Sequence, residues 1–158
     1  PSIELDTSDE AFRRKNPSIL VASYPAGFLG GINIQKELYP VSSLSEVGGV
    51  FTFEDNTPDV ISVKGSPLGQ QGASGGAVVT SEGNLIGLIS TASVAATTGE
   101  RELHAITGSH LERSFAERNT FSIKEMLAET DLAKLSEEFN RNVAPQLTRL
   151  LEDELARP

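Results

Sequence analysis

Residues 65–93 read GSPLGQQGASGGAVVTSEGNLIGLISTAS, and this stretch decides the fold. Its apolar runs at residues 77–80 and 85–90 are short, and the turn residues Glu82 to Asn84 separate them, which is typical of a β-hairpin. Glycines stand on both sides of Ser74, and glycine readily adopts the dihedral angles of a sharp loop. The stretch therefore predicts a serine on a tight loop beside a rigid hairpin.

Short apolar segments separated by turn residues continue on both sides of this stretch. Seven segments are expected to be strands: residues 19–24, 32–38, 47–53, 60–64, 77–80, 85–90 and 102–107. Gly, Pro, Asn and Asp gather between them, and these residues favour turns. Many short strands with no helix among them favour a β-sandwich or a small closed barrel.

From Ser109 onward the apolar residues recur with helical spacing. Ser109 with Glu112, and Ser122 with Glu125, are predicted to be capping boxes that each begin a short helix. A longer amphipathic segment follows, and Pro145 should kink or divide it because proline removes a helical hydrogen bond. Its apolar residues are Leu132, Leu135, Phe139, Val143, Leu147, Leu150, Leu151 and Leu155. We expect these helices either to pack on the β domain or to serve in oligomerisation or partner docking.

Composition and charge weigh against several classes of function. The formal net charge of −9 disfavours binding to nucleic acid or to an anionic membrane, and no apolar run is long enough to span a bilayer. The absence of cysteine excludes disulfides and a cysteine nucleophile, and it favours the cytoplasm over export. Two histidines are too few for a metal site, and no cofactor is expected. The chain begins at Pro1, which suggests a processed product or a trimmed fragment.

A serine among glycines is, taken alone, more often a flexible turn than a catalytic loop. A nucleophilic serine needs an exposed hydroxyl, two N–H groups facing the developing oxyanion, and close approach of the main chain to substrate. If the loop adopts such a conformation, the N–H groups of Gly72 and Ser74 would form the oxyanion hole. The pentapeptide permits this chemistry without establishing it.

The order Gly-x-Ser-Gly-Gly, then an apolar strand, a polar turn and Leu-Ile-Gly-Leu-Ile-Ser, resembles the trypsin/chymotrypsin-like serine protease superfamily. The resemblance covers roughly residues 18–118. Residues 19–27 are similar to the strand and turn that open the second barrel of bacterial members, and residues 102–111 resemble the last strand leading into the C-terminal helix.

This resemblance implies a six-stranded antiparallel Greek-key barrel, the second barrel of a chymotrypsin-like fold, followed by C-terminal α-helices. It also divides the chain into three parts. Residues 1–17 would be an interbarrel connection, residues 18–118 the barrel with its terminal helix, and residues 119–158 a helical extension.

The family's chemistry implies a serine endopeptidase that works through an acyl-enzyme, with Ser74 as nucleophile and the Gly72 N–H as an oxyanion donor. The residues implied to bind a protein or peptide substrate are Leu68, Ser90, Thr91, Ala92 and His104. No acid stands near Leu68 at the base of the specificity pocket, so small or apolar substrate side chains are expected. His104 could recognise an acidic or amide side chain, although a lone strand histidine is more often packed and hydrogen-bonded.

The chain departs from the family in its histidines. The catalytic order is histidine, aspartate, serine, but His104 and His110 both follow Ser74, and His110 is expected to be a surface residue. We expect the base and its aspartate from an N-terminal barrel, in the same gene or a companion chain. The aspartate would precede Pro1, whereas Asp6 would be only a turn residue. The isolated chain should be inactive, and the alternative is an inactive protease-like scaffold or protein-interaction module.

Overall fold

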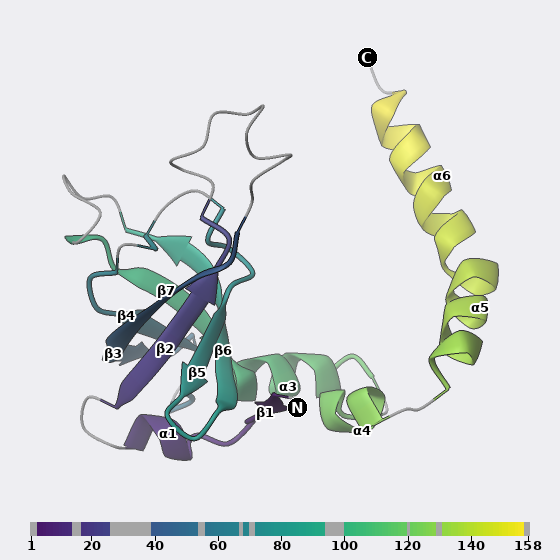
Figure 1. Ribbon diagram of the computed structural model, residues 1–158. Coiled ribbons are helices and arrows are strands. Elements are labelled where there is room, and N and C mark those ends of the chain that lie inside the picture. The colour runs from purple at the N-terminus through teal and green to yellow at the C-terminus, as the bar shows by residue number, and fades with distance from the viewer. Residues whose placement is uncertain are drawn as a thin grey trace. The chain divides into compact units, whose positions relative to one another are not determined.

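The computed structural model (Figure 1) describes residues 3–13, 17–25, 39–53, 56–66, 68–69, 72–93, 100–119, 121–128 and 131–156. The chain forms two compact units, residues 1–122 and residues 123–158. The first unit is a closed β-barrel with one extra strand, and the second is helical. The functional division into an interbarrel connection, a barrel and an extension stays a prediction.

Six antiparallel strands form the barrel. They are β2 (Ser18–Ser23), β3 (Val41–Phe51), β4 (Val60–Val63), β5 (Ala77–Thr80), β6 (Asn84–Ala92) and β7 (Leu103–Thr107). Neighbours follow the order β6-β5-β2-β3-β4-β7, and β7 pairs with β6 to close the barrel. Because β2, β3 and β4 are consecutive neighbours and β5 returns to lie beside β2, the arrangement is a Greek key. The predicted barrel is confirmed; the expected strand at residues 32–38 lies outside the described residues.

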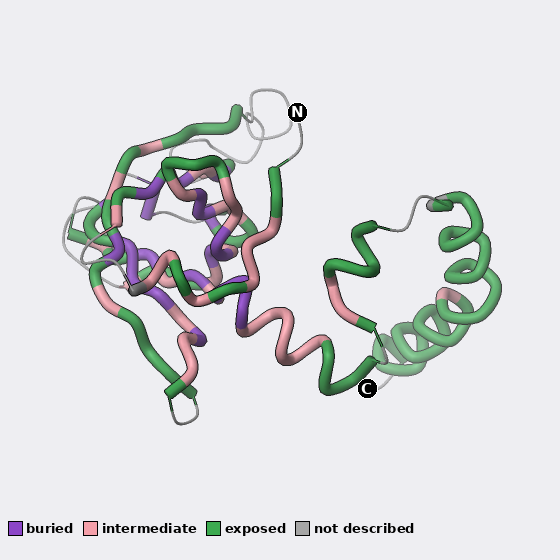
Figure 2. The backbone as a smooth tube through the Cα atoms, turned by 90° about the horizontal axis from the view of Figure 1, so that it is seen from below, coloured by how far each residue is buried: buried purple, intermediate pink, exposed green. Residues whose placement is uncertain are grey.

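Alternation along the strands builds the core. In β7 the side chains of Leu103, Ala105 and Thr107 are buried, whereas the residues between them are only half-buried. The buried apolar cluster consists of Ile19, Val21, Val47, Ile61, Val63, Leu68, Ala73, Val78, Ile86, Ile89, Leu103 and Ala105. Figure 2 shows the buried segments gathered along the barrel strands. Leu68 and Ala73 lie outside any strand, so their burial attaches the loop before β5 to the core.

The N-terminal segment has secondary structure of its own. It contains β1 (Glu4–Leu5), which pairs in parallel with the start of β6, and α1 (Glu10–Arg13), whose Ala11 and Phe12 pack against the core. The Asp6 carboxylate accepts a hydrogen bond from the Ser8 N–H at 2.8 Å, which fits the expected turn residue. Apolar side chains therefore fix this segment to the barrel.

Helix α3 (Gly108–Ala116) follows β7 directly, and its cap corrects the sequence prediction. Thr107, not Ser109, is the N-cap: its extended backbone lets the hydroxyl accept from the His110 N–H at 3.0 Å. The same hydroxyl donates to the Pro58 carbonyl at 2.7 Å. Ser109 is buried instead, with its hydroxyl 3.3 Å from the Pro58 carbonyl oxygen. The helix thus begins two residues earlier than a cap at Ser109 would predict, and β7 ends at Thr107, where the expected strand ends.

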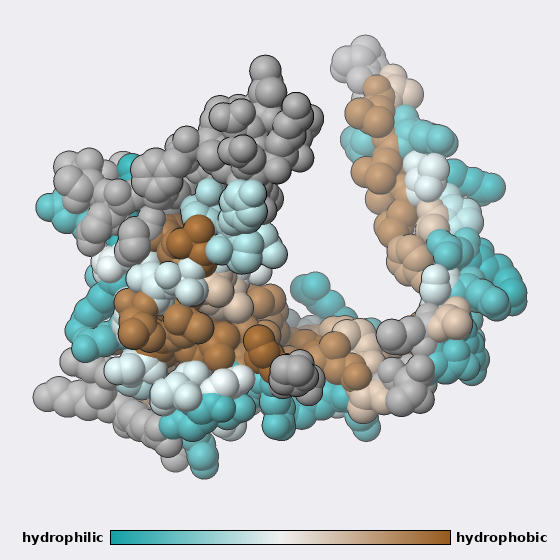
Figure 3. Space-filling view, in the orientation of Figure 1, coloured by the Kyte–Doolittle hydropathy of each residue, from teal (hydrophilic) through white to brown (hydrophobic). Residues whose placement is uncertain are grey.

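The helical unit contains α4 (Ile123–Ala128), α5 (Leu132–Asn142) and α6 (Ala144–Leu155). Pro145 lies in the first turn of α6, where a missing N–H costs no helical hydrogen bond, so its predicted division of the segment is confirmed. An apolar stripe runs along α5 and α6 (Figure 3), and its exposed members include Leu135, Phe139, Leu147 and Leu150. Among the described residues, no helix has the length and apolar character needed to cross a membrane.

Candidate functional site

The loop at residues 72–76 carries Ser74 between β4 and β5. Gly72 has a φ of 89° and Gly75 a φ of 81°. Residues with a Cβ rarely adopt this conformation, so glycine is required on both sides of the serine. The sequence pattern and the local backbone agree here.

Two main-chain hydrogen bonds hold the loop on β6. The Gly75 N–H donates to the Ile89 carbonyl at 2.8 Å, and the Ile89 N–H donates to the Gly76 carbonyl at 2.8 Å. Earlier in the loop, Ala73 is 2% exposed and packs in the core. The loop is therefore fixed from both sides, and Ser74 stands exposed at its tip.

Gly76 lies in close contact with β2, and a side chain at this position should lower the stability of the fold. A Cβ at this position would lie 2.6 Å from the Ala22 carbonyl oxygen and 2.7 Å from the Ser23 Cβ. We expect Gly76→Ala to lower the free energy of unfolding by about 2 to 3 kcal/mol in urea denaturation, because the contact is with main chain. Gly83→Ala is the matched control: it has space but a φ of 91°, and should cost about 1 kcal/mol. Equal losses in the two variants would contradict the close packing of the loop.

The Ser74 hydroxyl contacts the main chain of β6. Its Oγ donates to the Ser90 carbonyl at 3.0 Å, and the Ser90 hydroxyl donates to the His104 carbonyl at 3.3 Å. Thr91 and Ala92 follow as exposed residues at the end of β6. The structure thus brings Ser74 beside the strand that was predicted to bind substrate.

Two main-chain N–H groups at Ser74 have no acceptor among the described residues. Within the described residues, neither the Gly72 N–H nor the Ser74 N–H donates a hydrogen bond. A groove of about 470 Å³ lies at this point. Its lining residues are Ala22, Ser23, Tyr24, Pro40, Gly72, Ser74, Gly75, Gly76 and Ala77. A ligand in the groove would lie beside both Gly72 and Ser74.

The other predicted substrate residues occupy different surroundings. Leu68 is 2% exposed and belongs to the barrel core. His104 points away from the core: its ring packs edge-on against Phe51, with centroids 6.1 Å apart, and its Nδ1 lies 3.5 Å from the Thr91 Oγ1. These contacts fit a packed strand histidine, and the substrate roles of Leu68 and His104 stay predictions.

Arg101 makes a long-range contact that the sequence did not indicate. Its guanidinium donates to the Gly69 carbonyl at 3.0 Å, across 32 residues. This bond ties the loop that begins at Leu68 to the segment before β7. No local pattern around Arg101 signals such a partner.

The largest correction concerns His110, which is not a free surface residue. Its Nδ1 lies 2.8 Å from the Asp59 Oδ1, and the Arg113 guanidinium lies 2.6 Å from the same oxygen. The Asp59 Oδ2 accepts from the Phe53 N–H at 2.6 Å and from the Thr57 hydroxyl at 3.0 Å. Burial alone would raise the pKa of Asp59, but hydrogen bonds from Phe53, His110, Arg113 and Thr57 outweigh burial and hold that pKa well below its usual range.

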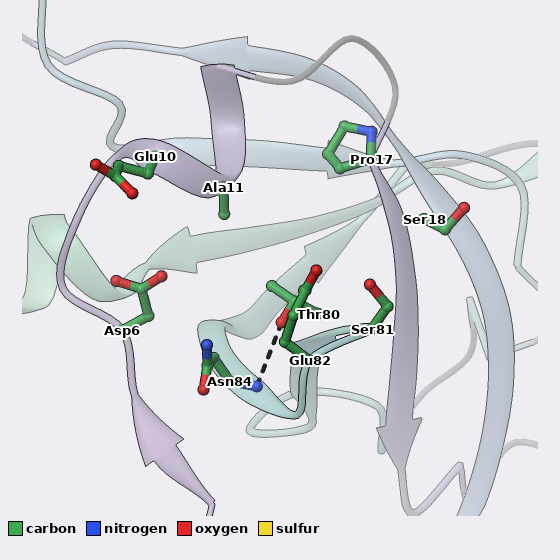
Figure 4. Close-up of a pocket in the computed structure, with 9 residues that line it drawn as sticks. All are labelled: Asp6, Glu10, Ala11, Pro17, Ser18, Thr80, Ser81, Glu82 and Asn84. Carbon is green, nitrogen blue, oxygen red and sulfur yellow. Dashed lines mark hydrogen bonds between the residues drawn. The ribbon is translucent and has the colours of Figure 1, made fainter.

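A second cavity, of about 370 Å³, lies between the N-terminal segment and the β5–β6 turn (Figure 4). Its lining residues are Asp6, Glu10, Ala11, Pro17, Ser18, Thr80, Ser81, Glu82 and Asn84. The Asn84 N–H donates to the Thr80 hydroxyl at 3.3 Å, which closes the turn.

In the described part of the chain no cluster of three or more His, Asp, Glu or Cys side chains is arranged to hold a metal ion. The groove at Ser74 is the better candidate for chemistry.

No protein-family model matches the chain, and no curated protein matches it. Among solved structures it is similar to the crystal structure of Rv3671c from M. tuberculosis H37Rv, a serine-to-alanine mutant in an inactive form, with 14% sequence identity and a TM-score of 0.49. The match covers 74% of this chain and 53% of that chain, so this chain spans about half the length of the Rv3671c structure. The fold is defined by the strand pairings of the chain itself.

Proposed function

We propose that this barrel is the nucleophile-bearing half of a serine endopeptidase of the trypsin/chymotrypsin-like type. The observation that carries the proposal is the loop at residues 72–76. It presents the exposed Ser74 hydroxyl in a groove, on a backbone fixed to β6, with the Gly72 and Ser74 N–H groups free among the described residues. An acyl-transfer site needs this combination of nucleophile and oxyanion donors.

In the proposed reaction the Ser74 Oγ attacks the peptide carbonyl carbon, and the two N–H groups stabilise the resulting oxyanion. A histidine takes the proton from Ser74 and returns it to the leaving amine, and water then hydrolyses the acyl-enzyme. Neither His104 nor His110 is hydrogen-bonded to Ser74 within the described residues. The base and its aspartate would therefore come from an N-terminal barrel, in the same gene or in a companion chain.

The proposed substrate is a protein or peptide whose backbone pairs with Ser90, Thr91 and Ala92 at the end of β6. Thr91 and Ala92 are exposed and follow the strand that contacts Ser74. An exposed strand end offers main-chain donors and acceptors to an extended peptide. The absence of an acidic residue beside Leu68 in the sequence favours small or apolar substrate side chains, and His104 beside Thr91 would be the polar group available for recognition.

One observation favours a second candidate, an inactive scaffold or protein-interaction module. The Ser74 hydroxyl is bound to a main-chain carbonyl, and among the described residues no titratable side chain contacts it. If no base reaches Ser74 in the complete protein, the loop would be only a rigid connection. The two candidates differ in the reactivity of one hydroxyl.

The test is labelling of the full-length protein with a fluorophosphonate probe. We expect the wild-type protein and a Ser81→Ala control, which changes an exposed turn serine, to be labelled, and Ser74→Ala to lose the label from this loop. A full-length protein with no label at Ser74 under any condition would refute the peptidase proposal and support the scaffold.

A further inference from the structure

A second serine stands at the end of a hydrogen-bonded chain of three side chains. The Asp59 Oδ1 lies 2.8 Å from the His110 Nδ1, and the His110 Nε2 lies 3.1 Å from the Ser114 Oγ. His110 and Ser114 are four residues apart on α3, so they share one face of the helix. The order carboxylate, imidazole, hydroxyl is the order that activates a serine nucleophile.

The ionised state of Asp59 determines which atoms donate in this series of hydrogen-bonded side chains. A carboxylate only accepts, so the proton facing it must be on the His110 Nδ1. In the neutral ring this leaves the Nε2 as an acceptor directed at the Ser114 hydroxyl. The Asp59 side chain is 4% exposed and is held by Arg113 and the Phe53 N–H. The ring therefore has a fixed partner and a fixed orientation.

We propose that Ser114 is a base-activated nucleophile, separate from Ser74, that accepts acyl groups from small activated esters. The Ser114 Oγ forms a bond to the ester carbonyl carbon while its proton passes to the His110 Nε2. The bond to the leaving alcohol then breaks, and the alcohol takes that proton from His110. The product is an acyl ester on Ser114, which water can cleave by the same proton transfers in reverse.

The surroundings indicate the class of ester. The ring of Phe53 packs edge-on against His110, with centroids 5.3 Å apart and an interplanar angle of 78°, and Phe53 is 65% exposed. An aryl leaving group could pack on this open aromatic surface. Ser114 lies near the C-terminal end of α3, where the helix carbonyls disfavour a developing negative charge. Slow acylation by aryl esters, not peptide hydrolysis, is the chemistry that fits.

The two serines lie on different elements, Ser74 on the loop before β5 and Ser114 on α3. Ser74 contacts Ser90, near the residues that pair with the start of β7. His110 and Ser114 lie on α3, which begins where β7 ends. Their reactions can therefore be separated by single substitutions.

The experiment treats the purified 158-residue chain with p-nitrophenyl acetate, follows p-nitrophenol release, and locates the acetyl group by peptide mass spectrometry. We expect one slow acetylation on Ser114 in the wild-type chain and in Ser74→Ala. It should be absent in Ser114→Ala and slowed on the order of 10²-fold in His110→Gln, which lacks the base. The matched control is Ser136→Ala, which changes an exposed serine of α5 whose hydroxyl accepts from the Asn140 side chain, and it should react like wild type.

Acetylation of Ser114 no faster than that of Ser136 would overturn the proposal, and so would an undiminished rate in Ser114→Ala. The position of the acetyl group in the wild-type chain decides the matter even if His110→Gln loses its fold, which circular dichroism would reveal. This proposal and the proposed peptidase function can fail independently. Ser114 can remain unacetylated while the fluorophosphonate labels Ser74, and Ser114 can be acetylated while Ser74 is not labelled.

Discussion

Peptide hydrolysis by the full-length protein is expected to fall by roughly 10⁴-fold or more in kcat/KM when Ser74 is replaced by alanine. The variant would keep the proposed oxyanion donors and the proposed substrate strand but would have no atom to form the acyl-enzyme. The measurement is cleavage of a fluorogenic peptide library by wild type and variant at equal concentration. The loss should appear in kcat, because the Ser74 hydroxyl contributes little to ground-state binding.

The fold should survive this substitution. Ser74 is exposed, and among the described residues its hydroxyl contacts only the Ser90 carbonyl. Ser74→Ala should therefore unfold in urea within about 0.5 kcal/mol of the wild type, as is usual for an exposed position. The Ser81→Ala control should keep full activity. Hydrolysis that persists in Ser74→Ala would show that another residue performs the chemistry.

Asp59→Asn is expected to lower the free energy of unfolding by about 3 to 5 kcal/mol. The buried carboxylate receives hydrogen bonds from Arg113, His110, Thr57 and the Phe53 N–H. An asparagine has one acceptor oxygen, and its NH₂ group would face one of these donors. The Arg113 cation would also lose its counter-ion. Urea denaturation at neutral pH measures the loss.

The same variant should change how stability depends on pH. The pKa of Asp59 is lower in the folded chain than the value of about 3.9 in an unfolded chain. Its contribution is therefore fully present above about pH 4 and is lost as the pH falls below that value. Asp59→Asn should remove this part of the acid destabilisation, whereas Asp6→Asn, which can keep the turn with Ser8, should retain it. An unaltered acid profile in Asp59→Asn would contradict the assignment.

Local patterns predicted the barrel strands best. The hairpin of β5 and β6 was expected because apolar runs flank the turn at Glu82–Asn84, and β5 agrees at both ends. Strand β3 begins at Val41, six residues before the predicted start at residue 47. Its first half contains Ser42, Ser43 and Ser45 and is mostly exposed. These polar residues lack the apolar alternation by which a strand is predicted.

Contacts between distant residues could not be predicted from local patterns. Asp59 and His110 are 51 residues apart, and the pairing of β4 with β7 brings their segments together. The N-cap at Thr107 was missed because a strand residue serves as the cap of the next helix. Ser74 could be singled out because its glycines are local, whereas its contact with Ser90 depends on the hairpin between them.

The most direct test of the central claim is a crystal structure of the full-length protein after reaction with a fluorophosphonate. We expect a covalent bond from the probe phosphorus to the Ser74 Oγ. The phosphoryl oxygen should lie about 2.7 to 3.1 Å from the Gly72 and Ser74 main-chain nitrogens. An adduct on a different serine, or a phosphoryl oxygen turned toward solvent with both N–H groups unused, would contradict the assignment of this loop.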